Sequence, residues 1–136
     1  MLFRSPAFGS LKGKTVAVLG LTFKPNTDDM RDAPSLVIVP KLQAMGARIR
    51  AYDPEGAAEA RKLLNIETCK DAYEAITGAD GVVILTEWNE FRALDLARVK
   101  SLLKRPLMVD LRNIYRPGMM EEAGFTYVSV GRATVG

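Results

Sequence analysis

Short apolar runs and helical patterns alternate along this chain of 136 residues, and this alternation constrains the fold more than any other feature. The apolar runs are continuous and rich in β-branched residues, which is typical of parallel strands covered on both faces. The expected strands are Thr15–Leu19, Ala47–Tyr52, Asn65–Glu67, Gly81–Leu85, Leu107–Asp110 and Thr126–Val130. The expected helices are Ala33–Met45, Ala57–Leu63, Asp71–Thr77, Leu94–Leu103 and Pro117–Glu122. This order predicts an α/β fold, Rossmann-like and doubly wound, with a mostly parallel sheet of about six strands and helices on both faces.

The chain length suits one domain around one core, and we expect that domain to span residues 11–136. The first ten residues, MLFRSPAFGS, lack an apolar stretch long enough for a signal peptide, so we interpret 1–10 as a linker or the edge of a longer chain. No apolar run approaches the roughly 20 residues that span a bilayer. The single Cys69 cannot form an intrachain disulfide, which fits a reducing cytoplasm. These features predict a cytoplasmic protein with no membrane partner.

Composition also argues against several kinds of site. The formal net charge is +3, but Lys and Arg are scattered rather than gathered in a patch with aromatic residues, so we expect no nucleic-acid partner. Histidine is absent, which excludes a Ser-His-Asp or Cys-His catalytic site within this chain. With no His and one Cys, we expect no zinc site either.

Ligands of open α/β sheets bind beyond the carboxyl ends of the strands. Three loops of this chain should therefore matter, namely 20–35, 86–91 and 111–117. The first begins with Gly20 but lacks the second glycine that lets the G-x-G-x-x-G turn approach a pyrophosphate. We therefore expect no NAD in the usual crevice of this domain.

Phe23 and Lys24 stand in place of the missing glycines, on a loop that Pro25 stiffens. Lys24 can meet a phosphate as a point charge and Phe23 offers a flat apolar surface, although the pair could also be a surface Lys beside a core Phe. In the loop after Asp110, Arg112 suits a phosphate or a base edge because its planar fork holds two acceptors. The alternative there is a tie within the loop, from Asp110 to Arg112 or to the backbone.

An acidic stretch follows Lys24 in the first loop. Asp32 or a neighbour is expected to cap the next helix, with Pro34 near its first turn. Asp28, Asp29 and Asp32 could in principle hold Mg²⁺ or Ca²⁺, but their spacing matches no established loop, and we expect no metal. Arg31 could pair within the loop or reach an anion on a neighbouring domain.

Two further segments carry structural expectations. Pro40 falls inside the first expected helix, where a proline costs about 3 kcal/mol, so this helix should bend or start later. After the strand Gly81–Leu85, Thr86 is expected to cap a short helix, and Trp88 and Phe91 are expected to pack in the core.

Four stretches match one known family in its order: GLTFKPNTDDMRDAPS (20–35), GARIRAYDP (46–54), ADGVVILTEWNEF (79–91) and VDLRNIY (109–115). They resemble the carboxyl-terminal domain of the UDP-glucose/GDP-mannose dehydrogenase family, from about Leu11 to the end. The resemblance implies the UDP-binding domain of an enzyme that oxidises UDP-glucose to UDP-glucuronate with two NAD⁺. It also implies an absent amino-terminal domain that binds most of the NAD, an absent central region with dimer contacts, and a full-length homodimer.

The resemblance also implies roles for individual residues. Phe23 and Lys24 resemble the family's contacts to the UDP-sugar. Arg112 resembles its Arg that reaches the substrate, often across the dimer, and Arg31 resembles its Arg that contacts NAD. The nucleophilic Cys of the family lies in a G-x-x-C-x-P-K-D type segment, which this chain lacks, and Cys69 is expected to be a small buried or semi-exposed residue. We therefore expect no catalytic residue here and no turnover by this chain alone.

Two alternatives stay open. The domain could belong to a dehydrogenase for another nucleotide sugar, such as UDP-N-acetylmannosamine or GDP-mannose, because the motifs do not specify the sugar. It could also be a stand-alone nucleotide-binding or regulatory module without a catalytic partner.

Overall fold

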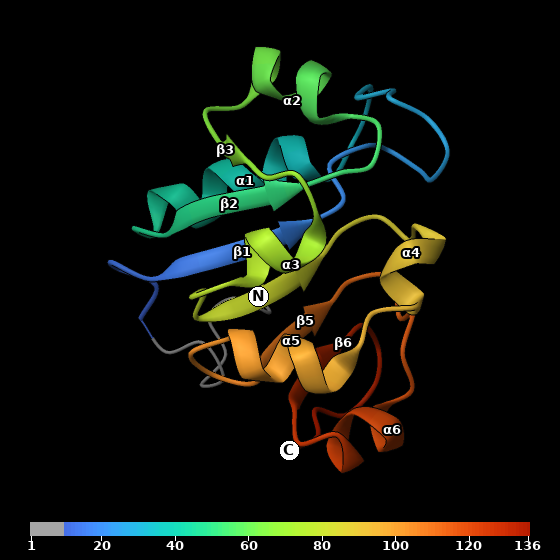
Figure 1. Ribbon diagram of the computed structural model, residues 1–136. Coiled ribbons are helices and arrows are strands. Elements are labelled where there is room, and N and C mark those ends of the chain that lie inside the picture. Colours follow the sequence, from blue (N-terminus) through green and yellow to red (C-terminus); the bar gives the residue numbers. More distant parts are fainter. Residues whose placement is uncertain (1–9) are drawn as a thin grey trace.

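Six parallel strands form one sheet in the computed structural model, which describes residues 10–136 (Figure 1). The expected linker 1–10 lies outside the described residues except for Ser10. The sheet has the order β3-β2-β1-β4-β5-β6, and each neighbouring pair of these strands is parallel. The strands are β1 (Thr15–Leu19), β2 (Arg48–Tyr52), β3 (Glu67–Thr68), β4 (Gly81–Ile84), β5 (Leu107–Asp110) and β6 (Thr126–Ser129).

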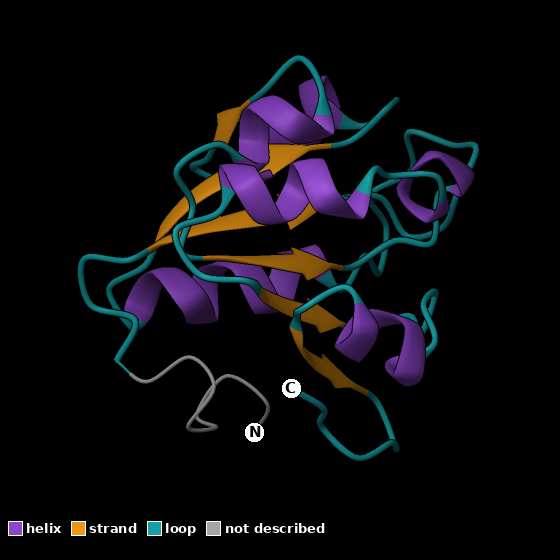
Figure 2. Ribbon diagram, turned by 60° about the horizontal axis from the view of Figure 1, so that its bottom comes forward, coloured by secondary structure: helices purple, strands orange, loops and turns teal. Residues whose placement is uncertain are grey.

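Helices cover both faces of this sheet (Figures 1 and 2). They are α1 (Ser35–Ala44), α2 (Ala57–Leu63), α3 (Ala72–Ile76), α4 (Asn89–Arg92), α5 (Leu96–Leu102) and α6 (Pro117–Glu122). Buried residues of α1 and α2 pack in one core cluster, and those of α3 to α6 pack in a second. The predicted Rossmann-like, doubly wound fold is therefore confirmed.

The central strands explain why the apolar runs are continuous rather than alternating. Every residue of β4 and β5 is buried. Within β4, Val83 belongs to the cluster under α1, whereas Val82 and Ile84 belong to the cluster under α3 and α5. Since neither face of these strands meets water, the side chains on both faces are apolar, except for that of Asp110, whose buried carboxylate is hydrogen-bonded.

The start of α1 differs from the expectation. The prediction that Asp32 or a neighbour caps this helix is wrong, because Pro34 holds the N-cap position and no side chain there accepts a first-turn N–H. Asp32 instead adopts a φ of +56°, in a turn that the Ala33 N–H closes onto the Met30 carbonyl (3.2 Å). The Ser35 hydroxyl donates to the Leu21 carbonyl (2.6 Å), which fixes α1 to the loop after β1.

Two other local expectations can be compared with the structure. The helix α1 starts at Ser35, two residues later than expected, and Pro40 lies inside it with its side chain exposed. The prediction that Thr86 caps the following helix is wrong, because Trp88 is the N-cap residue of α4 and makes no side-chain cap bond. Trp88 and Phe91 are buried, so their predicted packing role is confirmed.

Thr86 instead connects two loops, and this contact depends on Gly20. Its hydroxyl donates to the Thr22 carbonyl (2.8 Å) and so joins the loops after β4 and β1. Gly20 has a φ of +90°, and a β-carbon at this position would lie 2.5 Å from the Thr86 Cβ. The two strand ends can therefore approach this closely only because residue 20 has no side chain.

Asp53, directly after β2, holds the same loop from the other side. Asp53 is buried, with 4% of the residue exposed. Oδ2 accepts hydrogen bonds from the N–H groups of Leu21 (2.7 Å) and Thr22 (3.1 Å) and from the Thr22 hydroxyl (3.2 Å). Oδ1 accepts from the N–H groups of Glu55 (2.9 Å) and Gly56 (2.7 Å). One buried carboxylate thus satisfies four backbone donors that would otherwise lack partners.

We predict that Gly20→Ala destabilises the fold by about 3 kcal/mol, from left-handed backbone strain plus the clash with Thr86. Gly78→Ala is the matched control, since Gly78 also has a positive φ (+75°) but nothing lies within 4 Å of its added carbon. It should cost only about 1 kcal/mol. Urea unfolding of both variants measures the difference, and equal losses would contradict the close approach.

We predict that Asp53→Asn lowers the free energy of unfolding by about 2–3 kcal/mol, because an amide NH₂ would face backbone donors in place of a carboxylate oxygen. Glu55→Gln is the control, because it removes the charge of an exposed side chain two residues further along the chain. It should change the free energy of unfolding by less than about 0.5 kcal/mol. The midpoint of urea denaturation at constant slope is the measurement. An equal effect of the two substitutions would count against a structural role for Asp53.

Candidate functional site

Three loops meet at the carboxyl edge of the sheet, because β1, β4 and β5 are neighbours there. Arg112, in the loop after β5, connects all three. Its Nε donates to the Leu85 carbonyl (2.9 Å) and its Nη2 donates to the Phe23 carbonyl (3.2 Å). Nε also lies 3.3 Å from a carboxylate oxygen of Glu87. The guanidinium therefore bridges the loop that holds Phe23 and the loop that holds Glu87.

Asp110 fixes the loop that carries Arg112. Its carboxylate is fully buried and accepts the Arg112 N–H at Oδ1 (3.0 Å). Oδ2 accepts the N–H groups of Ile114 (2.8 Å) and Tyr115 (3.2 Å) and the Tyr127 hydroxyl (2.5 Å). Burial, followed by the contact with Asp110, raises the pKa of Tyr127, so this hydroxyl stays a donor. Of the two ties considered for this loop, the structure has the one from Asp110 to the backbone.

Phe23 and Lys24 form the exposed rim of the edge. Phe23 is 43% exposed, so the alternative of a core Phe is wrong. Its N–H donates to the Asp29 carbonyl (3.0 Å), and the Thr22 hydroxyl donates to the Lys24 carbonyl (3.1 Å). The backbone of this rim is therefore held in place while the Phe23 ring and the Lys24 ammonium face solvent.

Arg31 pairs with Asp29 within its own loop. Its Nη2 lies 2.8 Å from Oδ2 of Asp29, and its Nε lies 3.1 Å from Oδ1. The hydrogen bonds from the Arg31 side chain and N–H lower the pKa of Asp29 to about 2. The Arg31 side chain is 89% exposed, so one face of the guanidinium remains accessible.

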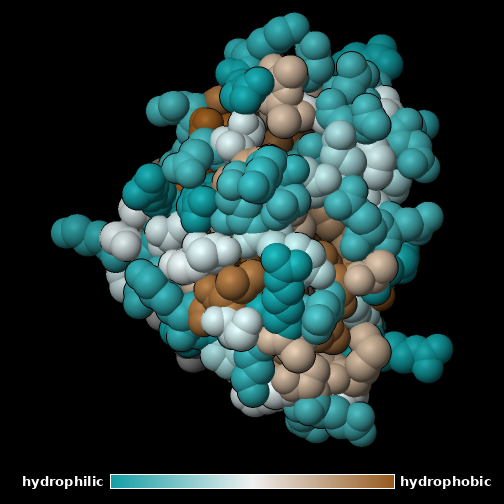
Figure 3. Space-filling view, viewed as in Figure 1, coloured by the Kyte–Doolittle hydropathy of each residue, from teal (hydrophilic) through white to brown (hydrophobic). Residues whose placement is uncertain are grey.

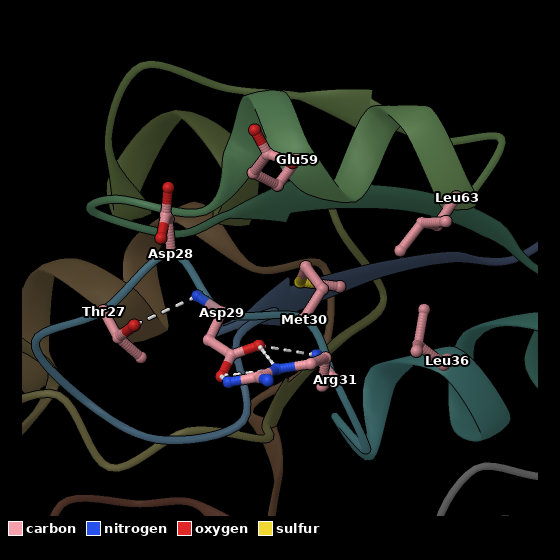
Figure 4. Close-up of a pocket in the computed structure, with 8 residues that line it drawn as sticks. All are labelled: Thr27, Asp28, Asp29, Met30, Arg31, Leu36, Glu59 and Leu63. Atoms are coloured by element: carbon pink, nitrogen blue, oxygen red, sulfur yellow. Dashed lines mark hydrogen bonds and ion pairs between the residues drawn. The ribbon is translucent and has the colours of Figure 1, made fainter.

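A pocket of about 750 Å³ lies beside this ion pair, between the loop and the helices α1 and α2. Figure 4 shows the Arg31 guanidinium against the Asp29 carboxylate, with Leu36 of α1 and Leu63 of α2 facing each other across the pocket. The lining is completed by Thr27, Asp28, Met30 and Glu59. The pocket thus has an apolar side on the helices and a charged side on the loop.

The structure brings some of the predicted residues together and separates others. Arg112 is hydrogen-bonded to Phe23, and Lys24 is the next residue on the same rim. The pocket beside Arg31 is lined by none of these three. The candidate site therefore has two parts, a basic edge formed by Phe23, Lys24 and Arg112, and a separate pocket that contains Arg31.

Sequence reasoning missed Asp53 and Glu87 as residues that shape the site. An acidic residue directly after a strand and before Pro54, as in the stretch YDP, was the available signal for Asp53. Nothing in the local sequence relates Glu87 to Arg112, which lies 25 positions further along the chain.

Other kinds of chemistry find little support in the described residues. Within 10–136 no group of three or more His, Cys, Asp or Glu side chains is placed to hold a metal ion. Cys69 is buried, and desolvation raises its pKa, so the predicted buried small residue is confirmed. No helix in this range is long and apolar enough to cross a membrane. On the face drawn in Figure 3, apolar areas are small and lie between hydrophilic ones.

Comparisons with known proteins agree with this geometry. The model of the UDP-binding domain of the UDP-glucose/GDP-mannose dehydrogenase family matches residues 17–117. The chain is 58% identical to a UDP-glucose 6-dehydrogenase of Rhizobium meliloti over 127 residues, which covers 93% of the chain but 29% of that protein. It is 46% identical to the UDP-glucose 6-dehydrogenase TuaD of Bacillus subtilis, covering 93% of the chain and 28% of the relative.

Solved structures give the same result. A UDP-glucose dehydrogenase from Pyrobaculum islandicum superposes with a TM-score of 0.78 at 30% identity, covering 97% of this chain and 28% of that one. A UDP-D-ManNAc dehydrogenase from Pyrococcus horikoshii gives 0.73 at 28% identity, covering 90% and 26%. The chain thus spans less than a third of the length of these relatives. Because the family model matches most of its residues, the chain belongs to the UDP-glucose/GDP-mannose dehydrogenase family and corresponds to its UDP-binding domain.

Proposed function

We propose that this chain binds the UDP part of a nucleotide sugar, as the UDP-binding domain of a UDP-glucose 6-dehydrogenase. The observation that carries the proposal is the bond between Arg112 Nη2 and the Phe23 carbonyl (3.2 Å). It places a guanidinium beside the rim that ends in the Lys24 ammonium, and these two cations come from loops far apart in sequence. Two cations at the carboxyl edge of a parallel sheet form a suitable site for a diphosphate.

Each residue of the basic edge has a separate task. Lys24 would meet the phosphates as a compact point charge, and Arg112 would hold two phosphate oxygens with its planar fork. Phe23 would offer its exposed ring to the uracil or the ribose. Binding energy gained at the nucleotide, remote from the reacting carbon, orients the sugar for oxidation.

The usual dinucleotide crevice of this fold does not fit NAD here. Both carboxylate oxygens of Asp53 already accept hydrogen bonds from backbone N–H groups and a hydroxyl, so neither is available to a ribose. The Thr86 hydroxyl closes the gap between the β1 and β4 loops. We therefore infer that NAD, which would accept the hydride, is held mainly by an amino-terminal domain of the longer enzyme, and that this chain alone does not turn over substrate.

Arg31 is the residue through which this domain would contact that cofactor. Its guanidinium is paired with Asp29 yet 89% exposed, and it borders the pocket between α1 and α2. The Asp29 carboxylate holds the guanidinium in one orientation, which reduces the entropy lost when an anion binds to its open face. The partners of the domain would then be the UDP-sugar, the amino-terminal and central domains, and the second subunit of a homodimer.

A second candidate within the same family is a dehydrogenase for another nucleotide sugar. It is favoured by the likeness to the UDP-D-ManNAc dehydrogenase from Pyrococcus horikoshii, with a TM-score of 0.73. Titration of the chain with UDP and GDP separates a uridine site from a guanosine site, as GDP-mannose would need. Comparison of UDP-sugars needs the longer enzyme. A stand-alone binding module would be indicated by a gene that encodes no further dehydrogenase domain.

We predict that Lys24→Ala weakens UDP binding by about five- to tenfold, because one charge-assisted phosphate contact is lost. Isothermal titration calorimetry with UDP is the measurement. Lys41→Ala is the matched control, since Lys41 is an exposed lysine on α1 outside the basic edge. Unchanged affinity in Lys24→Ala would contradict its phosphate role, and no saturable UDP binding by the parent chain at millimolar UDP would contradict the proposed function.

We also predict that Arg31→Ala raises the pKa of Asp29 from about 2 toward its ordinary value of 3.8. A carboxylate whose pKa is lowered by folding stabilises the native state above the unfolded pKa, and this contribution is lost as the pH falls from about 3.8 to about 2. The carboxyl carbon shift in an NMR titration gives the pKa. Arg48→Ala, which removes an arginine paired with Glu67, should leave the Asp29 titration unchanged.

A further inference from the structure

Arg112 forms an ion pair with a carboxylate of its own chain. Its Nε lies 3.3 Å from Oε2 of Glu87, and the two side chains are 30% and 31% exposed. The other two partners of the guanidinium, the carbonyls of Leu85 and Phe23, are neutral. Glu87 is therefore the group that balances the charge of Arg112 within the described part of the chain.

The position of Glu87 is fixed by its neighbours rather than by its own side chain. Thr86 is fully buried and bonded to the loop after β1, and Trp88 is 7% exposed in the core. A residue between two such anchors has little backbone freedom. The Glu87 carboxylate is thus held beside the guanidinium, while its partial exposure leaves it free to turn toward solvent.

We propose that Glu87 is an internal anion that occupies Arg112 in the empty site and is displaced when the diphosphate binds. The proposal rests on the function proposed above. The Glu87 carboxylate lies beside Nε and partly neutralises the guanidinium, so it competes with a phosphate for the charge of Arg112. The neutral carbonyls of Leu85 and Phe23 keep the guanidinium oriented during the exchange. Glu87 therefore sets the nucleotide affinity and keeps the loops joined when no nucleotide is bound.

The competition predicts opposite effects on binding and on stability. Removal of the Glu87 charge leaves Arg112 unpaired and available to the phosphates, which should tighten UDP binding by about three- to fivefold, the upper part of the range for a partly exposed ion pair. The same change removes an ion pair from the empty site, so the urea midpoint should stay the same or fall slightly. A Glu87 with a purely structural role would leave UDP binding unchanged or weaken it.

The test is calorimetric titration of UDP into this chain and its Glu87→Gln and Glu90→Gln variants. Glu90 is the matched control, because it lies three residues away and accepts a hydrogen bond from the Tyr52 hydroxyl (3.1 Å) that a Gln can also accept. Glu90→Gln changes the net charge by the same amount as Glu87→Gln but does not alter the contacts of Arg112. The UDP affinity of the Glu90→Gln variant should therefore stay within about twofold of the parent. The gain from Glu87→Gln should vanish when Arg112 is replaced by Ala in both backgrounds.

Each outcome decides between the two proposals. If Glu87→Gln binds UDP more tightly and Glu90→Gln does not, the result supports the displacement of Glu87 by the diphosphate. Unchanged or weaker binding in Glu87→Gln, with normal UDP binding by the parent, overturns the exchange and leaves the proposed function intact. An equal gain in Glu90→Gln, or a gain that persists without Arg112, also overturns it, since the effect would then be a general one of charge. No UDP binding by the parent or by Glu87→Gln overturns both proposals.

Discussion

The buried carboxylate of Asp53 is the interaction on which the carboxyl edge of this sheet depends. It accepts hydrogen bonds from the N–H groups of Leu21 and Thr22 near the end of β2, and so it fixes the path of the loop after β1. Gly20 lets the Thr86 side chain close the same gap from the other side. Asp53 and Thr86 therefore tie the loops after β2 and β4 to the loop after β1 at the carboxyl edge of the sheet.

The rim depends in turn on a second buried carboxylate. Asp110 holds the N–H groups of the loop after β5 and thereby sets the path along which Arg112 reaches the loops after β1 and β4. Both carboxylates lie at the ends of strands and accept hydrogen bonds mainly from backbone N–H groups. The two cations of the basic edge, Lys24 and Arg112, are exposed and half-exposed, and this buried framework supports them.

Local chemistry explains which expectations were met. The strands were predictable because β4 and β5 are buried on both faces, which forces continuous apolar runs. The N-cap residues of α1 and α4 were not predictable, because a hydroxyl near a helix start can donate to a distant carbonyl instead. The Ser35 hydroxyl donates to Leu21, and the Thr86 hydroxyl donates to Thr22. Asp32 was expected to cap α1, but its backbone is held in a left-handed turn that moves it away from the helix end. Phe23 was ambiguous between core and surface until its exposure was known.

The sequence by itself determined the sheet, its helices, the family and the cations of the basic edge, since each of these depends on residue type and spacing along the chain. Only the tertiary structure decided which groups those cations meet. Arg112 joins Phe23, Leu85 and Glu87, which are distant in sequence, and Arg31 borders a separate pocket. The physical reason is that parallel strands in the order β1-β4-β5 bring the ends of remote segments to one edge. Hydrogen bonds and ion pairs across that edge form between neighbours in space, whose separation along the chain carries no local signal.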